Sequence, residues 1–416
     1  MLFRSADEAV RRRYRFAPLP KTADQPNESL ATHFELHAEI TVPSDQTAIT
    51  AGRLLEVREQ GQRRTFVYAG EQPVNGFPIV AARYAELRGG DLAVYYHPRH
   101  GYNAAALLDV LAAARQSYET AYGPLPQRDL RFAEFPGLTR FAISFPTAIP
   151  CSESLVFLTQ NTGEHVNANY FAVAHEVAHQ WFGNLVAPAR GPGGDVLMEG
   201  LAEYSAGALI EDKLGRQAAG LFRGYEESTY LQNCDPDHEL PLAAVDRSHR
   251  SHDVLVYQKA GLVFHMLEQL LGRTKMNAAL REYVTRFRQS AARPTLDELL
   301  ALFKQQDGTL NWFYEQWFQR VTLPDFQITS AAVRREGAEY VVEFIAGNAG
   351  QGRMPVTIEA IADDEKIHVP ASATITLSQD SETRGILRCA FRPARLTLDR
   401  RRNVLDTNRS NNELRF

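Results

Sequence analysis

Two histidines and a glutamate stand at a spacing that suits metal-assisted hydrolysis. Residues 175 to 179 read His-Glu-Val-Ala-His and lie within a run that has helical periodicity. Residues four positions apart share one face of a helix, so His175 and His179 can converge on a single zinc ion. Glu176 lies about 100° around the helix, where it can reach a water molecule in the open coordination position. The alternative is an exposed helix that carries two histidines by chance.

A catalytic zinc site needs a third protein ligand, and the next acidic segment offers one. Residues Asp195 to Leu214 are predicted to form a helix that ends at Gly215, with Glu199 and Glu203 four positions apart on one face. Glu199 is the predicted third ligand, with a water in the fourth position. Glu203 has two alternatives: it accepts an N–H bond from a zinc-binding histidine, or it lies on a solvated acidic face.

Three segments of the sequence resemble a known family. They are HEVAHQWFGNLV from His175, MEGLAEY from Met198 and VYQKAGLVFHMLEQLLG from Val256. These segments are similar to the gluzincin zinc aminopeptidases typified by aminopeptidase N and leukotriene hydrolase. The nineteen residues between His179 and Glu199 also fit thermolysin-like proteases, so the flanking residues rather than the spacing favour the aminopeptidase family.

The resemblance implies an activity and a role for each site residue. It implies a metallopeptidase that hydrolyses peptide bonds and releases N-terminal residues, with one Zn²⁺ per chain. The metal ligands would be the two histidines and Glu199, and Glu176 would be the general base that activates a zinc-bound water. It further implies that Tyr257 stabilises the transition state. From the residues alone, Tyr257 is either an oxyanion donor or a core aromatic residue.

One motif of the family is missing from this sequence. The family's GxMEN strand holds the substrate's free amine through its glutamate, but the segment AIPCSES, with Glu153 as its single carboxylate, stands in that place. Glu153 is therefore either the amine-binding residue or a surface glutamate in a serine-rich turn. A strand is expected directly after it, at Leu155 to Leu158. The longer segment FAISFPTAIPCSES resembles peptidase-like domains attached to some bacterial ABC-type permeases.

The pattern of apolar residues along the chain predicts the strands and helices that position these residues, and together they predict a multidomain α+β fold. Alternating apolar residues indicate an N-terminal antiparallel β domain at 1–100, and the resemblance implies that this domain is truncated. Residues 101–323 are predicted to be mainly helical, starting with a helix at Ala104 to Tyr122, and the resemblance implies a thermolysin-like catalytic domain there. Alternating apolar residues return at 324–416 and predict a β-sandwich.

Composition narrows the class of protein. The chain has 416 residues, a net charge of −5 and 44% hydrophobic residues, which is typical of a globular enzyme and lacks the basic charge of a nucleic-acid binder. Its three cysteines form no CxxC pair, so neither a disulfide framework nor a thiolate metal site is expected. No transmembrane segment or signal peptide is recognisable, which predicts a soluble chain that is cytoplasmic or is a soluble domain of a membrane protein.

One alternative function belongs to a different class. The chain could be a peptidase-like module that captures or docks substrates for a membrane transporter, with little turnover. A complete set of metal ligands favours catalysis over that alternative. A peptide or protein is the expected partner, and the sequence indicates no oligomeric state.

Overall fold

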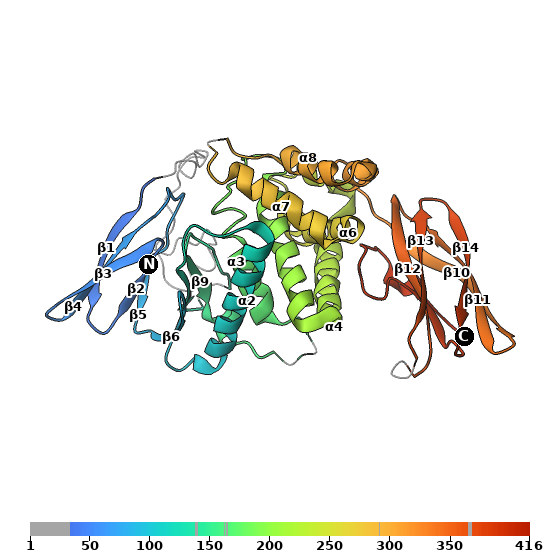
Figure 1. Ribbon diagram of the computed structural model, residues 1–416, viewed down its shortest axis with the longest axis horizontal. Helices are drawn as coiled ribbons and strands as arrows, with labels where there is room; N and C mark the ends of the chain where they lie inside the picture. The colour runs from blue at the N-terminus through green and yellow to red at the C-terminus, as the bar shows by residue number, and fades with distance from the viewer. Residues whose placement is uncertain (1–33, 138–139, 162, 164, 291, 365–367) are drawn as a thin grey trace. The chain divides into compact units, whose positions relative to one another are not determined.

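The chain forms two compact units. The computed structural model describes residues 34–137, 140–161, 163, 165–290, 292–364 and 368–416. The first unit comprises the described residues up to Asp109 together with Leu125–Thr159, and the second comprises Val110–Pro124 and Gln160–Phe416. An N-terminal antiparallel sheet, a helical middle region and C-terminal antiparallel sheets follow one another along the chain (Figure 1), as the predicted α+β class requires. The division at residues 100 and 323 stays a prediction.

The first unit is built from three small sheets. Their strand orders are β1-β4-β3, β2-β5 and β6-β7-β8-β9, and only the pairs β7–β8 and β8–β9 of the third sheet are parallel. Phe66 and Tyr68 alternate along β4 and pack against Val42 and Ala48 to form one of its cores. The strands are β1 (His37–Pro43), β2 (Thr47–Ile49), β3 (Arg53–Gln60), β4 (Arg63–Ala69), β5 (Val80–Ala82), β6 (Ala85–Gly89), β7 (Leu92–Tyr96), β8 (Leu130–Phe135) and β9 (Ala148–Ser152).

The strand predicted at Leu155 to Leu158 is wrong. The strand lies earlier, at β9, and Glu153–Phe157 forms a turn of π-helix. Strand β9 is the last named strand of its sheet, and on the side away from β8 it makes isolated bridges to Ala142 and Phe145, so Pro150, which has no N–H to donate, lies where the pairing is irregular. The side chain of Asn103 donates hydrogen bonds to the carbonyl oxygens of Val156 and Thr159, at 2.6 and 2.8 Å, and these bonds hold the turn closed.

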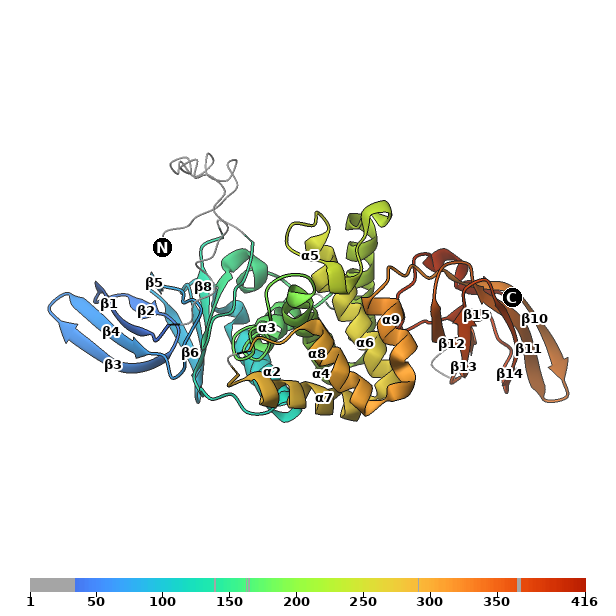
Figure 2. The ribbon, with the colours of Figure 1, turned by 90° about the horizontal axis from the view of Figure 1, so that it is seen from above.

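Helices form the first part of the second unit, and both views show them as one bundle (Figures 1 and 2). Helix α2 occupies the predicted range Ala104–Tyr122 and runs from the first unit into the second. Large aromatic side chains such as Trp181, Phe264 and Trp317 are fully buried among the helices. The remaining helices are α3 (Ala168–Ala178), α4 (Leu201–Asn233), α5 (His252–Val254), α6 (Ala260–Leu271), α7 (Arg273–Phe287), α8 (Leu296–Gln306) and α9 (Asn311–Phe318).

Two of these helices follow directly on π-helical turns. A π-helical turn, Val196–Gly200, precedes α4, and another, Leu255–Lys259, precedes α6. The helix predicted to end at Gly215 is interrupted there, where φ is 84°, but a further helical segment follows directly and reaches Asn233. Glycine adopts this conformation without the steric penalty that a Cβ brings.

Antiparallel strands form the C-terminal part of the second unit. They make two sheets, with strand orders β10-β11-β14 and β13-β12-β15-β16. Apolar side chains such as Val342, Phe344, Val356 and Ile358 are buried in these sheets. The strands are β10 (Phe326–Glu336), β11 (Glu339–Asn348), β12 (Arg353–Ile361), β13 (Ala371–Ser378), β14 (Glu382–Cys389), β15 (Arg395–Leu398) and β16 (Glu413–Arg415).

Candidate metal centre

Helix α3 brings the two histidines together at its C-terminal end. Asn167 caps the start of the helix, and its side chain accepts a hydrogen bond from the Tyr170 amide at 3.1 Å. His175 lies on the last turn and His179 directly follows the helix, and their Nε2 atoms are 3.0 Å apart. Nδ1 of His179 donates to the Phe182 carbonyl oxygen at 2.9 Å, which leaves Nε2 as the nitrogen that faces the cluster.

Glu199 completes a cluster with the two imidazoles. Its Oε2 atom lies 3.1 Å from Nε2 of His179 and 3.4 Å from Nε2 of His175. This oxygen is buried and finds no hydrogen-bond partner within the described part of the chain. Burial raises the pKa of Glu199, but the two histidines outweigh that effect and hold the pKa well below its usual value.

The donor set fits a zinc ion. Ligand atoms of His175, His179 and Glu199 lie within 4.8 Å of one another, and all three residues are buried. Two imidazole nitrogens and one carboxylate oxygen match a catalytic zinc site with an open fourth position. A bound cation would also give the buried Oε2 atom of Glu199 a partner, which it lacks within the described residues.

Glu203 is buried rather than solvated. It is 2% exposed, and its Oε1 atom faces Nδ1 of His175 at 3.6 Å. The alternative of a solvated acidic face therefore does not describe this residue. Burial raises the pKa of Glu203 well above its usual value, and the carboxylates of Glu226, Glu199 and Glu176 add to the rise. At 3.6 Å the two atoms are not hydrogen-bonded, so the role of Glu203 as the carboxylate that accepts the N–H of His175 stays a prediction.

Tyr257 and Glu176 also adjoin the cluster. The ring of Tyr257 stacks on the imidazole of His175, with centroids 5.7 Å apart and an angle of 11° between the planes. Burial, followed by the charge of Glu199, raises the pKa of Tyr257, so its phenol stays protonated and can donate a hydrogen bond. Glu176 is 8% exposed, and burial raises its pKa to about 7 although the His179 imidazole opposes the rise.

This geometry agrees with a comparison against known protein families. Residues 103–317, just over half of the chain, match the peptidase family M1 domain. The chain belongs to peptidase family M1.

Relatives of this M1 chain include aminopeptidases. Aminopeptidase M1-B of Oryza sativa subsp. japonica is 26% identical over 288 residues, which cover 65% of this chain and 32% of the relative. Tricorn protease-interacting factor F2 of Thermoplasma acidophilum is 22% identical over 307 residues, 66% of this chain and 38% of the relative. The chain thus spans about a third of the length of the curated relatives it matches.

A solved structure supports the fold of the M1 chain. Legionella pneumophila aminopeptidase A, in complex with aspartic acid, superposes with a TM-score of 0.64 at 16% sequence identity. The match covers 89% of this chain and 44% of the Legionella chain.

Among the described residues of the M1 chain, no helix has the length and apolar character that crossing a bilayer requires.

Glu153, where the M1 chain departs from its family's motif, lies in the first unit. Its Oε1 atom accepts a hydrogen bond from the Gly137 amide at 3.0 Å, and its Oε2 atom is 3.8 Å from Nδ1 of His100. The same nitrogen of His100 is 2.5 Å from Oε1 of the buried Glu134. Glu153 therefore belongs to a cluster of two carboxylates and an imidazole. The metal cluster belongs to the second unit, so an amine-binding role for Glu153 stays a prediction.

Glu226 was missed by the sequence analysis. It is 1% exposed, and both of its carboxylate oxygens are unpartnered within the described residues. It lines a small cavity between α4 and α6 with Glu203, Arg223 and His265, and burial raises its pKa to about 8. It follows Glu203 by twenty-three positions, beyond the break at Gly215, so no spacing rule for one straight helix connects the two carboxylates.

Proposed function

We propose that this chain is a zinc-dependent metallopeptidase that releases N-terminal residues from peptides. One zinc ion per chain is held by His175, His179 and Glu199. The observation that carries the proposal is the convergence of their three ligand atoms within 4.8 Å in a buried site. Family membership and the aminopeptidases among the relatives support the activity.

The chain's own residues have distinct tasks in this reaction. Zinc, when bound, polarises the peptide carbonyl and lowers the pKa of the attacking water. Glu176 takes the proton of that water and passes it to the leaving amine. The hydroxyl of Tyr257 donates to the oxygen on which negative charge develops. Glu203 holds the imidazole of His175 in position.

Removing the general base tests the mechanism. We expect Glu176→Gln to keep the zinc content of the parent but to lower kcat by about 10² to 10⁴. His179→Ala should lose both the metal and the turnover, because it removes a ligand. Metal content is measured by mass spectrometry and turnover with fluorogenic aminoacyl substrates. Full activity in Glu176→Gln, or bound zinc without turnover in the parent, would contradict the proposal.

Recognition of the substrate's free amine is the finer part of the proposal. Glu153 offers a carboxylate in the segment that replaces the family's amine-binding motif, and a charge-assisted hydrogen bond to an ammonium contributes about 1.5 to 3 kcal/mol. We expect Glu153→Ala to raise KM for free-amine peptides about tenfold or more and to leave the poor cleavage of N-acetylated peptides unchanged. The exposed Glu282→Ala is the matched control. Equal cleavage of free and acetylated peptides by the parent would indicate an endopeptidase instead.

A further inference from the structure

The second half of α4 packs back against the first half and places Glu226 opposite Glu203. The helix is interrupted at Gly215, and a Cβ at Gly207 in the first half would lie 2.9 Å from a ring carbon of Phe222 in the second half. Glu203 precedes Gly207 by four positions, and Glu226 follows Phe222 by four positions. Because four residues make about one helical turn, the two glutamates face one another one turn further from the break. Both line the same cavity of about 20 Å³.

Three carboxylate oxygens of these two residues are buried and unpartnered. Glu226 is 1% exposed and Glu203 is 2% exposed. Neither oxygen of Glu226 has a hydrogen-bond partner in the part of the chain that the structure describes, and Oε2 of Glu203 has none there either. The other oxygen of Glu203, Oε1, is the one that faces His175. A buried carboxylate oxygen without a donor costs free energy, and a proton held between the two carboxyl groups would recover it.

Among the described residues that line this cavity, no cation pairs with Glu226. Arg223 lines it, but its Nη1 donates to Glu211 at 3.0 Å and its Nη2 donates to the Arg401 carbonyl oxygen at 2.9 Å. His265 lines it too, and burial lowers the pKa of its imidazole to about 3, so this ring is uncharged at neutral pH. Burial therefore acts on Glu226 without a compensating charge.

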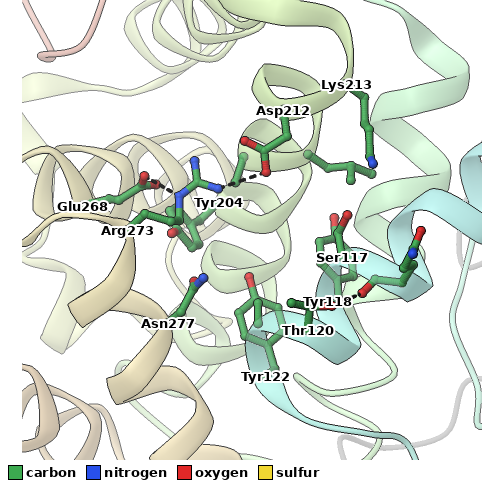
Figure 3. A pocket seen from close by; sticks show the side chains of 14 residues that line it. Ser117, Tyr118, Thr120, Tyr122, Tyr204, Asp212, Lys213, Glu268, Arg273 and Asn277 are labelled. Atoms are coloured by element: carbon green, nitrogen blue, oxygen red, sulfur yellow. Dashed lines mark hydrogen bonds and ion pairs between the residues drawn. The ribbon is translucent and has the colours of Figure 1, made fainter.

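Two other buried glutamates of the second unit each have a cation. Glu268 accepts a hydrogen bond from Nε of Arg273 at 2.5 Å, beside the larger cavity that Figure 3 shows. Glu239 is paired with the ammonium of Lys259. A paired cation offsets the cost of burying the charge of a carboxylate. Glu226 lacks such a cation among the described residues, and burial favours its protonated form instead.

We propose that Glu226 is a positioning residue of the metal centre, which shares one proton with Glu203 and so holds that carboxyl group against His175. The proton joins the two side chains directly or through a single water molecule, for which a cavity of about 20 Å³ has room. In either case Oε1 of Glu203 remains an acceptor for the N–H of His175, whichever glutamate carries the proton. This role rests on the proposed zinc site, because His175 is one of its ligands.

Two substitutions at Glu226 distinguish this role from packing. Glu226→Gln is uncharged and keeps a donor and an acceptor, whereas Glu226→Met fills similar space and offers neither a donor nor a strong acceptor. We expect Glu226→Gln to keep the zinc affinity of the parent and Glu226→Met to lower it about tenfold or more, as the loss of an outer hydrogen bond at a metal site does. Competition with a chelator of known affinity measures the effect. The exposed Glu282→Met is the matched control and should change nothing.

A double-mutant cycle shows whether Glu226 acts through Glu203. In a chain that carries Glu203→Ala, we expect Glu226→Met to lower the zinc affinity no further, because the residue through which it acts is gone. Circular dichroism of the metal-free variants checks that each is folded. Glu226→Ala is a second variant without a hydrogen-bonding group, so a folding defect in Glu226→Met does not decide the result.

The outcomes separate this role from the proposed function. Equal zinc affinity of the parent, Glu226→Gln and Glu226→Met would overturn the role of Glu226 alone. An equal loss in Glu226→Gln and Glu226→Met would also overturn it, because a residue that keeps the hydrogen bond would then fail to replace the glutamate. An additive loss in the double variant would show that Glu226 does not act through Glu203. A parent chain that binds no zinc would overturn the proposed function and this role with it.

Discussion

At the scale of single residues, the hydroxyl of Tyr257 is the group whose role a conservative change isolates best. Tyr257→Phe removes one oxygen and keeps the ring that stacks on His175. Because one oxyanion donor contributes about 10² to 10³ to kcat, we expect a loss of that size with the zinc content and the melting temperature unchanged. Steady-state kinetics measures kcat, and a thermal scan measures the melting temperature. A lower melting temperature with unchanged kcat would assign Tyr257 to packing.

The site residues differ in how well the sequence predicts them. His175 and His179 follow from helical spacing, because residues four positions apart share a face, and Glu199 follows from the need of a catalytic zinc site for a third ligand. Burial of Glu203 could not be read from its spacing, since an acidic residue on a helix is solvated in most proteins. Glu226 had no local signal, because its proximity to Glu203 depends on the path of the chain beyond Gly215 and on the packing of α6.

At the scale of elements, α4 and α6 approach closely through glycines. A Cβ at Gly261 would lie 2.7 Å from Cβ of Glu203, and one at Gly200 would lie 2.6 Å from Cβ of Ala260. Both distances are shorter than side chains tolerate, so the two helices can keep this separation only with glycine at these positions. The close approach also holds Glu203 beside His175.

Gly261→Ala tests this contact. We expect it to lower the free energy of unfolding by about 1 to 3 kcal/mol, because the added methyl group forces the backbone of α6 away from α4. Zinc affinity should fall as well, since Glu203 moves with the contact. Denaturant titration and metal competition measure the two effects. Gly308→Ala is the control, because a Cβ at Gly308 meets nothing within 4 Å. Equal stability of both variants would contradict the close-packing argument.

Sequence periodicity predicted the helices well but missed their irregular first turns. Glu199 and Tyr257 both lie on π-helical turns that precede regular helices. A five-residue turn is too short for its period to differ measurably from 3.6, so a hydrophobic pattern cannot reveal it. The misplaced strand at Leu155 has a similar cause. A short apolar run is compatible with a strand or a helical turn. Here the hydrogen bonds from the side chain of Asn103 to the carbonyl oxygens of Val156 and Thr159 stabilise the turn.

At the scale of the whole second unit, ion pairs fasten the C-terminal strands to the helical bundle. Glu227 of α4 is 3% exposed and accepts hydrogen bonds from Arg409 and Arg402, both at 2.7 Å, and from the Asp406 amide at 3.0 Å. Arg409 also donates to Asp399 at 3.0 Å. The contacts of Glu227 join residues more than 170 positions apart, so they form only when both parts are folded.

Glu227→Ala should therefore weaken the connection between the two parts as well as the total stability. The change leaves the guanidinium of Arg409 without its main carboxylate partner, and breaking one partner of a buried pair costs about 3 to 5 kcal/mol. We expect calorimetry to resolve an early transition for the C-terminal strands, with proteolysis near Arg401 accelerated below the melting temperature of the helical bundle. The exposed pair of Glu282 and Arg286 provides the control, because Glu282→Ala should cost less than about 1 kcal/mol. A single unshifted transition in Glu227→Ala would show that apolar packing, rather than this network, holds the two parts together.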